Sequence, residues 1–166
     1  TGVVYNREEM ECLGGLVADH GLFLLADEVY REFVYDGAPF TSAFHLSGID
    51  DRVIILDSVS KRFSACGARI GYLATHNKDV LESTLRYGQA RLCPATVAQL
   101  AATAGFYSPP SYTDQVLAEY TRRRDVLHAS LSSIPGVTAH KPEGAFYTVA
   151  RLPVEDAEKF AIWLLT

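Results

Sequence analysis

One lysine lies in a run of small and hydroxylated residues, SVSKRFSACGARIGY (residues 58–72). A lysine amine can form a Schiff base with an aldehyde. Serine hydroxyls and a guanidinium can hold a phosphate dianion, and glycine lets the backbone approach a ligand closely. The spacing therefore suits a cofactor that carries both an aldehyde and a phosphate. It makes Lys61, Ser58, Ser60 and Arg69 candidate binding residues.

A second group of candidate residues lies upstream, in LFLLADEVY (residues 22–30). The apolar run 22–26 is short, continuous and followed by polar residues, which predicts a buried strand. Asp27 would then lie at the carboxyl end of that strand, the edge at which open α/β sheets bind ligands. Without Lys61 downstream, Asp27 would be better read as a turn or N-cap residue, and Tyr30 as a half-buried aromatic.

The elements around these motifs predict an α/β fold. The run 53–57 is a second buried strand that ends just before Ser58, so parallel strands would deliver Asp27 and Lys61 to one edge. Asn6 and Glu9 predict a capping box that opens a helix, which Gly21 ends. We expect the glycines at 14 and 15 to mark close packing on the sheet. Further predictions are a loop at 36–51, a short strand at 70–74, and helices at 77–87 and 94–107.

The sequence SPP at 108–110 is the strongest boundary signal in the chain. After it, Ser111 and Asp114 predict the start of a long amphipathic helix, which Pro135-Gly136 ends. Short strands are predicted at 137–139 and 146–149, and a last helix at 155–165. No internal repeat or low-complexity tract interrupts this order.

Composition argues against several classes of function. The 166 residues are 48% hydrophobic and 21% charged, with a net charge of −5, which disfavours a nucleic acid or an anionic membrane as the main partner. The basic run Arg122-Arg123-Arg124 is predicted to be a solvated helix face with local ion pairs. No long apolar segment or signal peptide is evident.

The three cysteines are odd in number and far apart. They form neither a disulfide framework nor a metal-binding pattern, and the histidines are scattered, so we predict no metal site and a reducing, cytoplasmic location. Cys66 lies inside the lysine motif, where we interpret it as a small packing residue.

The lysine motif resembles the pyridoxal 5'-phosphate (PLP) attachment site of class I/II aminotransferases, the aspartate-aminotransferase-like enzymes of fold type I. The resemblance implies that Lys61 forms the Schiff base with the cofactor and that Arg69, Ser58 and Ser60 bind its phosphate. It also implies that Asp27 faces the protonated pyridine nitrogen and that Tyr30 donates to the ring phenolate oxygen.

The resemblance implies a domain organisation as well. Residues 1–108 would be the C-terminal half of the PLP-binding large domain, part of a mostly parallel sheet flanked by helices. Residues 109–134 would be a long connecting helix, and 135–166 the beginning of a small α+β domain. Residues 1–5 resemble the end of the family's Asn-Pro-Thr-Gly turn, and 142–147 its first small-domain strand. We therefore expect a fragment of a longer enzyme, without the arginine that binds the substrate carboxylate.

The implied reaction is transfer of an amino group between an amino acid and a 2-oxo acid, most like aspartate aminotransferase, by a homodimer in amino-acid metabolism. Thr96 is a candidate contact to the partner's phosphate or, equally, a helix cap. PLP-dependent β-lyases and cyclopropane-forming synthases share these motifs, and Ala68 departs from the Trp that many aminotransferases carry. The motifs are also compatible with a non-catalytic, aminotransferase-like sensor domain and with an inactive fragment.

Overall fold

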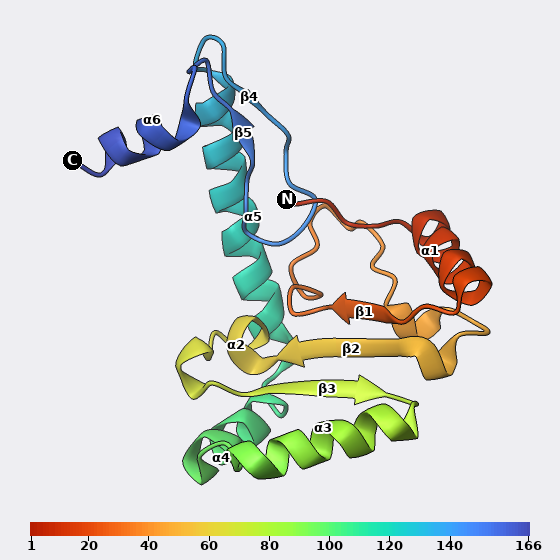
Figure 1. The fold of residues 1–166 in the computed structure, drawn as a ribbon. Helices are drawn as coiled ribbons and strands as arrows, with labels where there is room; N and C mark the ends of the chain where they lie inside the picture. Colours follow the sequence, from red (N-terminus) through yellow and green to blue (C-terminus); the bar gives the residue numbers. More distant parts are fainter.

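The computed structural model describes residues 1–166 as a three-stranded sheet with helices, from which a long helix leads to a two-stranded sheet and a last helix (Figure 1). The helices are α1 (Arg7–His20), α2 (Val59–Arg62), α3 (Lys78–Arg91), α4 (Thr96–Gly105), α5 (Pro110–Ser132) and α6 (Ala157–Leu164). The strands are β1 (Leu24–Asp27), β2 (Val53–Ser58), β3 (Gly71–Thr75), β4 (Thr138–Ala139) and β5 (Ala150–Arg151). The predicted α/β class is confirmed.

The parallel pairing of β1 with β2 sets the edge at which the candidate residues lie. Leu24 is in register with Val53 and Asp27 with Leu56. β3 pairs with the other side of β2 in the antiparallel direction, with Gly71 opposite Ser58. The predicted strands are thus present within two residues of their expected limits, and both motifs follow strands that end at the same edge of the sheet.

Helix α1 forms for the local reason that the sequence predicts. The Glu9 N–H donates to the Asn6 side chain at 2.9 Å, and Glu9 accepts from the Asn6 N–H at 2.8 Å. Gly21 closes the helix with a φ of 61°. Of the two glycines inside it, Gly14 is buried against Leu46 and Ile49, whereas an added Cβ at Gly15 would meet open space. Gly14 therefore packs closely, but against loop residues and not on the sheet, and the prediction was wrong for Gly15.

The core lies between α1 and the sheet. Its buried side chains are Met10, Val17, Ala43, Leu46, Ile49, Val53 and Ile55. Three of them come from the segment predicted as an irregular loop, which instead contains the short 3-10 turns Ala43–His45 and Asp50–Arg52. These turns bring apolar side chains under β2, so the loop contributes to the fold.

Two predictions in the second half of the chain were wrong. Helix α5 begins at Pro110, after Pro109, and no side chain caps it, so the predicted Ser111 cap is absent. The strand expected at 146–149 lies instead at Ala150–Arg151. The backbone of the preceding segment is bonded elsewhere: Ala145 donates to the Phe33 carbonyl at 2.8 Å, and Tyr35 donates to that of Glu143 at 2.8 Å. None of the helices is long and apolar enough to cross a membrane.

The basic run on α5 is only partly a solvated face. Arg122 and Arg123 are exposed and both bind Glu119, as predicted. Arg124 is buried, which contradicts the prediction. Its guanidinium donates two 3.0 Å hydrogen bonds to Asp36. Because this partner is 88 residues away in the sequence, helical periodicity could not reveal it.

Candidate functional site

The lysine motif begins directly at the end of β2, where α2 forms a single turn. Ser58 is the N-cap, and its hydroxyl accepts the Ser60 N–H at 3.3 Å. Val59 is completely buried and fixes the turn in the core. Lys61 lies two residues later, half-buried. The amine is therefore carried by a short helix that is anchored at its start.

Two aromatic rings lie beside the Lys61 amine. Its nitrogen is 5.8 Å from the centroid of the Tyr30 ring and 5.3 Å from that of Phe146. These rings come from the turn after β1 and from the segment that follows α5. Aromatic faces attract a cation at such distances. Three separate parts of the chain thus meet at the amine.

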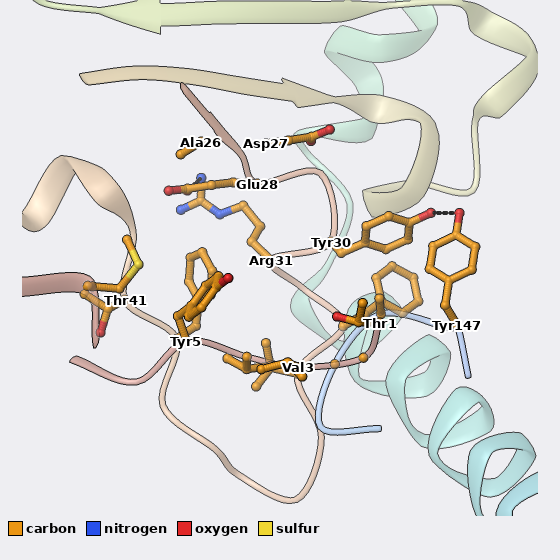
Figure 2. Close-up of a pocket in the computed structure, with 18 of the residues that line it drawn as sticks. Thr1, Val3, Tyr5, Ala26, Asp27, Glu28, Tyr30, Arg31, Thr41 and Tyr147 are labelled. Atoms are coloured by element: carbon orange, nitrogen blue, oxygen red, sulfur yellow. Dashed lines mark hydrogen bonds and ion pairs between the residues drawn. The ribbon is translucent and has the colours of Figure 1, made fainter. Parts of the chain in front are cut away.

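Asp27 is the last residue of β1 and is exposed. One carboxylate oxygen accepts the Val29 N–H at 3.2 Å. This is the turn in which an aspartate side chain bonds to its own backbone two residues further on. Figure 2 shows Asp27 and Tyr30 extending to the same side, whereas Glu28 extends away from them. Asp27 thus combines a turn role with a carboxylate on the Tyr30 side of the sheet edge.

Tyr30 is held by a second phenol. Its hydroxyl lies 2.5 Å from that of Tyr147 (Figure 2). Burial raises the pKa of Tyr30 well above its usual value, and the hydrogen bond with Tyr147 and the charge of Asp27 raise it further. The phenol therefore stays protonated and can donate. Sequence reasoning assigned no chemistry to Tyr147, whose only signal was its place in the segment 142–147.

The backbone that directly follows Arg69 bonds to the start of α2. Ser58 is paired with Gly71, and the Val59 N–H donates to the Ile70 carbonyl at 3.2 Å. The exposed Arg69 guanidinium donates to the Cys66 carbonyl at 2.9 Å and makes no ion pair with a carboxylate. Cys66 is itself exposed, so its interpretation as a packing residue was wrong.

A pocket of about 470 Å³ opens beside β1 (Figure 2). Asp27 and Tyr30 line it together with Tyr147 and the segment 1–5, whereas Ser58, Ser60, Lys61 and Arg69 do not. The six candidate residues therefore share one sheet edge but do not line a single cavity. The pocket also contains Glu28, a buried carboxylate that sequence reasoning missed. One of its oxygens accepts from Ser42 and Ala43, and the other has no hydrogen-bond donor.

Known proteins are similar over most or all of the chain. The sequence model of the family described as "Aminotransferase class I and II" matches residues 1–166. Aspartate aminotransferase of Geobacillus stearothermophilus is 35% identical over 149 residues, 89% of this chain and 38% of that protein. Aromatic-amino-acid aminotransferase 2 of Thermococcus litoralis is 34% identical over 155 residues, 92% of this chain and 39% of that protein.

Solved structures agree with this relationship. The alanine aminotransferase from Pyrococcus furiosus superposes with a TM-score of 0.90 at 32% identity, over 99% of this chain and 44% of that one. The chain spans about two fifths of the length of the proteins that it matches. Sequence and fold lead to the same assignment: the chain belongs to the class I and II aminotransferase family.

Proposed function

We propose that the full-length protein uses pyridoxal phosphate to transfer an amino group between an amino acid and a 2-oxo acid. Enzymes of this family depend on that cofactor. The observation that carries the proposal is the shared edge of β1 and β2. The motif with Lys61 and the turn with Asp27 and Tyr30 follow these two strands, and the lysine amine lies 5.8 Å from the centroid of the Tyr30 ring.

The chemistry of the donor set fits pyridoxal phosphate. The group, when bound, supplies an aldehyde for the amine and a pyridine ring that withdraws electrons from the substrate α-carbon. On this proposal, the Arg69 guanidinium and the hydroxyls of Ser58 and Ser60 bind the phosphate. The guanidinium makes a single hydrogen bond within the chain, to a carbonyl, which leaves most of its donors free for an anion.

The remaining side chains have roles in proton transfer. The Asp27 carboxylate favours the protonated pyridine nitrogen, because an opposite charge stabilises a cation. The Tyr30 phenol, which stays protonated, donates to the ring oxygen. The Lys61 amine would take the proton from the substrate α-carbon as general base and deliver it to the aldehyde-derived carbon of the cofactor as general acid.

We propose aspartate as the amino donor. Several of the similar proteins are named aspartate aminotransferases, although relatives named for aromatic amino acids and for alanine have comparable identities. The β-lyase, cyclopropane-synthase and sensor functions share the lysine motif and stay open on the residues of this chain. Ammonia released from the amino acid without a 2-oxo acid acceptor would favour the lyase.

The domain division and the assembly are proposals of the same kind. Residues 1–108 would form the C-terminal half of the large domain, 109–134 the connecting helix and 135–166 the beginning of the small domain. Homologues are generally dimeric, which supports a homodimer. Three free cysteines support a reducing compartment such as the cytoplasm. We expect residues 1–166 alone not to transaminate aspartate and 2-oxoglutarate.

The test is to trap the cofactor on the full-length protein. Borohydride reduction with pyridoxal phosphate, followed by peptide mass spectrometry, should place the adduct on Lys61. Lys61→Ala should abolish it and lower turnover by roughly a thousandfold or more. Lys159→Ala is the matched control, because that lysine is 84% exposed on α6. An unchanged adduct in Lys61→Ala would refute the assignment.

A further inference from the structure

The residue that follows Lys61 takes part in a buried ion network. Arg62 donates from Nη2 to the Asp57 carboxylate at 3.2 Å. The Asp57 side chain is only 1% exposed, and its other oxygen accepts the Ser58 N–H at 2.7 Å. Asp57 therefore bonds to the residue that caps α2 and to the last residue of that helix. Lys61 lies between these two attachments.

The same guanidinium nitrogen reaches the turn after β1. Arg62 Nη2 is 3.1 Å from a carboxylate oxygen of Glu32, which lies two residues after Tyr30. The Arg62 side chain is 16% exposed, so solvent screens these ion pairs less than it would at the surface. Asp57, Arg62 and Glu32, here called the Arg62 bridge, thus join the Lys61 helix to the turn that carries Asp27 and Tyr30.

The C-terminal end of α2 packs against helix α4 and the residue that follows it. The Phe63 ring packs edge-to-face with Phe106 at 5.1 Å between centroids. A Cβ added at Gly105 would come within 2.9 Å of the Phe63 ring, so α4 approaches closely. The Arg62 guanidinium also lies 5.9 Å from the centroid of the Phe106 ring. Packing at the end of α2 and the Arg62 bridge thus both contact the Lys61 helix, and Arg31, 3.8 Å from Asp57, adds a longer ion pair from the Tyr30 turn.

We propose that Arg62 is a positioning residue: through Asp57 and Glu32 it holds the Lys61 amine in place against the Tyr30 turn. This inference rests on the proposed function, because it concerns the placement of the lysine that would take the cofactor. Arg62 itself need not touch substrate or cofactor. Small displacements of a reacting group can lower rates by large factors, which is why such a bridge would matter.

The test uses the full-length protein and two readouts. Hydrogen exchange without cofactor, followed in peptides that cover 28–33 and 59–63, reports whether the two turns are joined. The rate at which pyridoxal phosphate becomes trappable on Lys61 reports its placement. The variants are Arg62→Met, Glu32→Gln and the double variant, with Arg62→Lys as the conservative replacement. Arg86→Met is the control, because Arg86 pairs only with Glu82 on the exposed face of α3.

We expect Arg62→Met to accelerate exchange in both peptides and to slow adduct formation roughly tenfold. Glu32→Gln should act in the same direction, and the double variant should be no worse than Arg62→Met, because Arg62→Met already removes the ion pair with Glu32. Arg62→Lys should restore part of the rate. Glu32 is 35% exposed, so its isosteric variant keeps the test decisive if Arg62→Met does not fold.

Three results would overturn the inference. Exchange within twofold of the wild type in both peptides would mean that the Arg62 bridge does not hold the two turns together, and that other contacts such as the Arg31–Asp57 pair do. Faster exchange with an unchanged adduct rate would mean that Arg62 supports the fold without placing Lys61. Absence of any adduct on wild-type Lys61 would contradict the proposed function, and the positioning role with it.

Discussion

Arg124 and Arg69 are two arginines with opposite surroundings. Arg124 is buried on α5 and donates to Asp36, Asp125 and the Pro142 carbonyl, with its guanidinium 4.6 Å from the centroid of the Tyr35 ring. Arg69 is exposed and donates only to the Cys66 carbonyl. The Arg124 guanidinium that donates to Asp36 also holds the pKa of that carboxyl below its usual value.

The difference in surroundings distinguishes an arginine that stabilises the fold, Arg124, from one that is a candidate to bind a ligand, Arg69. The donors of Arg124 are used within the chain, where they join α5 to Asp36 and to the Pro142 carbonyl. Those of Arg69 are mostly free, at the edge of the sheet where the lysine motif begins. An arginine that binds an anion needs unused donors in a fixed fork. The prediction that Arg124 is solvated was wrong, because its partners Asp36 and Pro142 are distant from it in the sequence. The phosphate-binding role of Arg69 stays a prediction.

The largest expected effect that tests this comparison is on cofactor affinity. Arg69→Met should weaken binding of pyridoxal phosphate to the full-length protein by roughly 10- to 150-fold, the loss of about 1.5–3 kcal/mol of charge-assisted hydrogen bonding. The free energy of unfolding should change little, because Arg69 has no buried partner. Fluorescence titration gives the affinity and urea denaturation the stability. Unchanged affinity would remove Arg69 from the phosphate site.

Arg124→Met should show the reverse pattern. Because Asp36 and Asp125 are about half exposed, we expect a loss of roughly 1–3 kcal/mol of stability, less than for a fully buried pair. Cofactor affinity of the folded protein should stay within about threefold. Arg123→Met is the neighbouring control, since that side chain is 60% exposed and pairs with Glu119 at the surface. Equal stability losses in the two variants would end the distinction between scaffold and surface arginines.

Two glycines test the packing around these regions. At Gly144, two residues after the Pro142 carbonyl that Arg124 contacts, an added Cβ would lie 2.6 Å from Val4 Cγ2 and 3.0 Å from the Phe33 carbonyl oxygen. Gly144→Ala should therefore cost about 1–3 kcal/mol. At Gly88, on α3, the added Cβ meets open space, so Gly88→Ala should stabilise by up to about 1 kcal/mol. Urea denaturation measures both, and a tolerated Gly144→Ala would show that the junction is loose.

The sequence predicted those parts of the fold that depend on neighbouring residues. The capping box at Asn6, the strands β1 and β2, and the helices α3 and α4 follow from local pattern and were confirmed. The shared edge of Asp27 and Lys61 also followed, because it needs only parallel pairing of two strands. Strand limits at 146–149 failed, since the adjoining backbone at 143–145 bonds to residues more than 100 positions away.

In the candidate site too, local sequence pattern identified some residues, whereas others are recognised only from contacts distant in the sequence. A motif could name Lys61 and Arg69 because their spacing is fixed along the chain. It could not find Tyr147, which reaches Tyr30 across 117 positions, nor the Glu28 carboxylate inside the pocket. Asp57 precedes the motif and Arg62 lies within it. Only the structure shows that Asp57 bonds to Ser58 and to Arg62, on either side of Lys61 in the sequence.

The smallest expected effect concerns a scaffold phenol, Tyr72, and gives the stability a pH dependence. Burial and a hydrogen bond to Asp57, with 2.5 Å between the two oxygens, together raise the pKa of Tyr72 to about 12. Since the folded value lies above the ordinary 10.0, the stabilisation is complete below pH 10 and is lost as the pH rises towards 12. Urea denaturation at several pH values should show a steeper fall for the wild type than for Tyr72→Phe in that window. Tyr72 is 39% exposed, so the difference should be modest. Parallel pH dependences would mean that Tyr72 does not donate to Asp57 in solution, and the Asp57 carboxylate would then depend on Arg62, Arg31 and the Ser58 N–H alone.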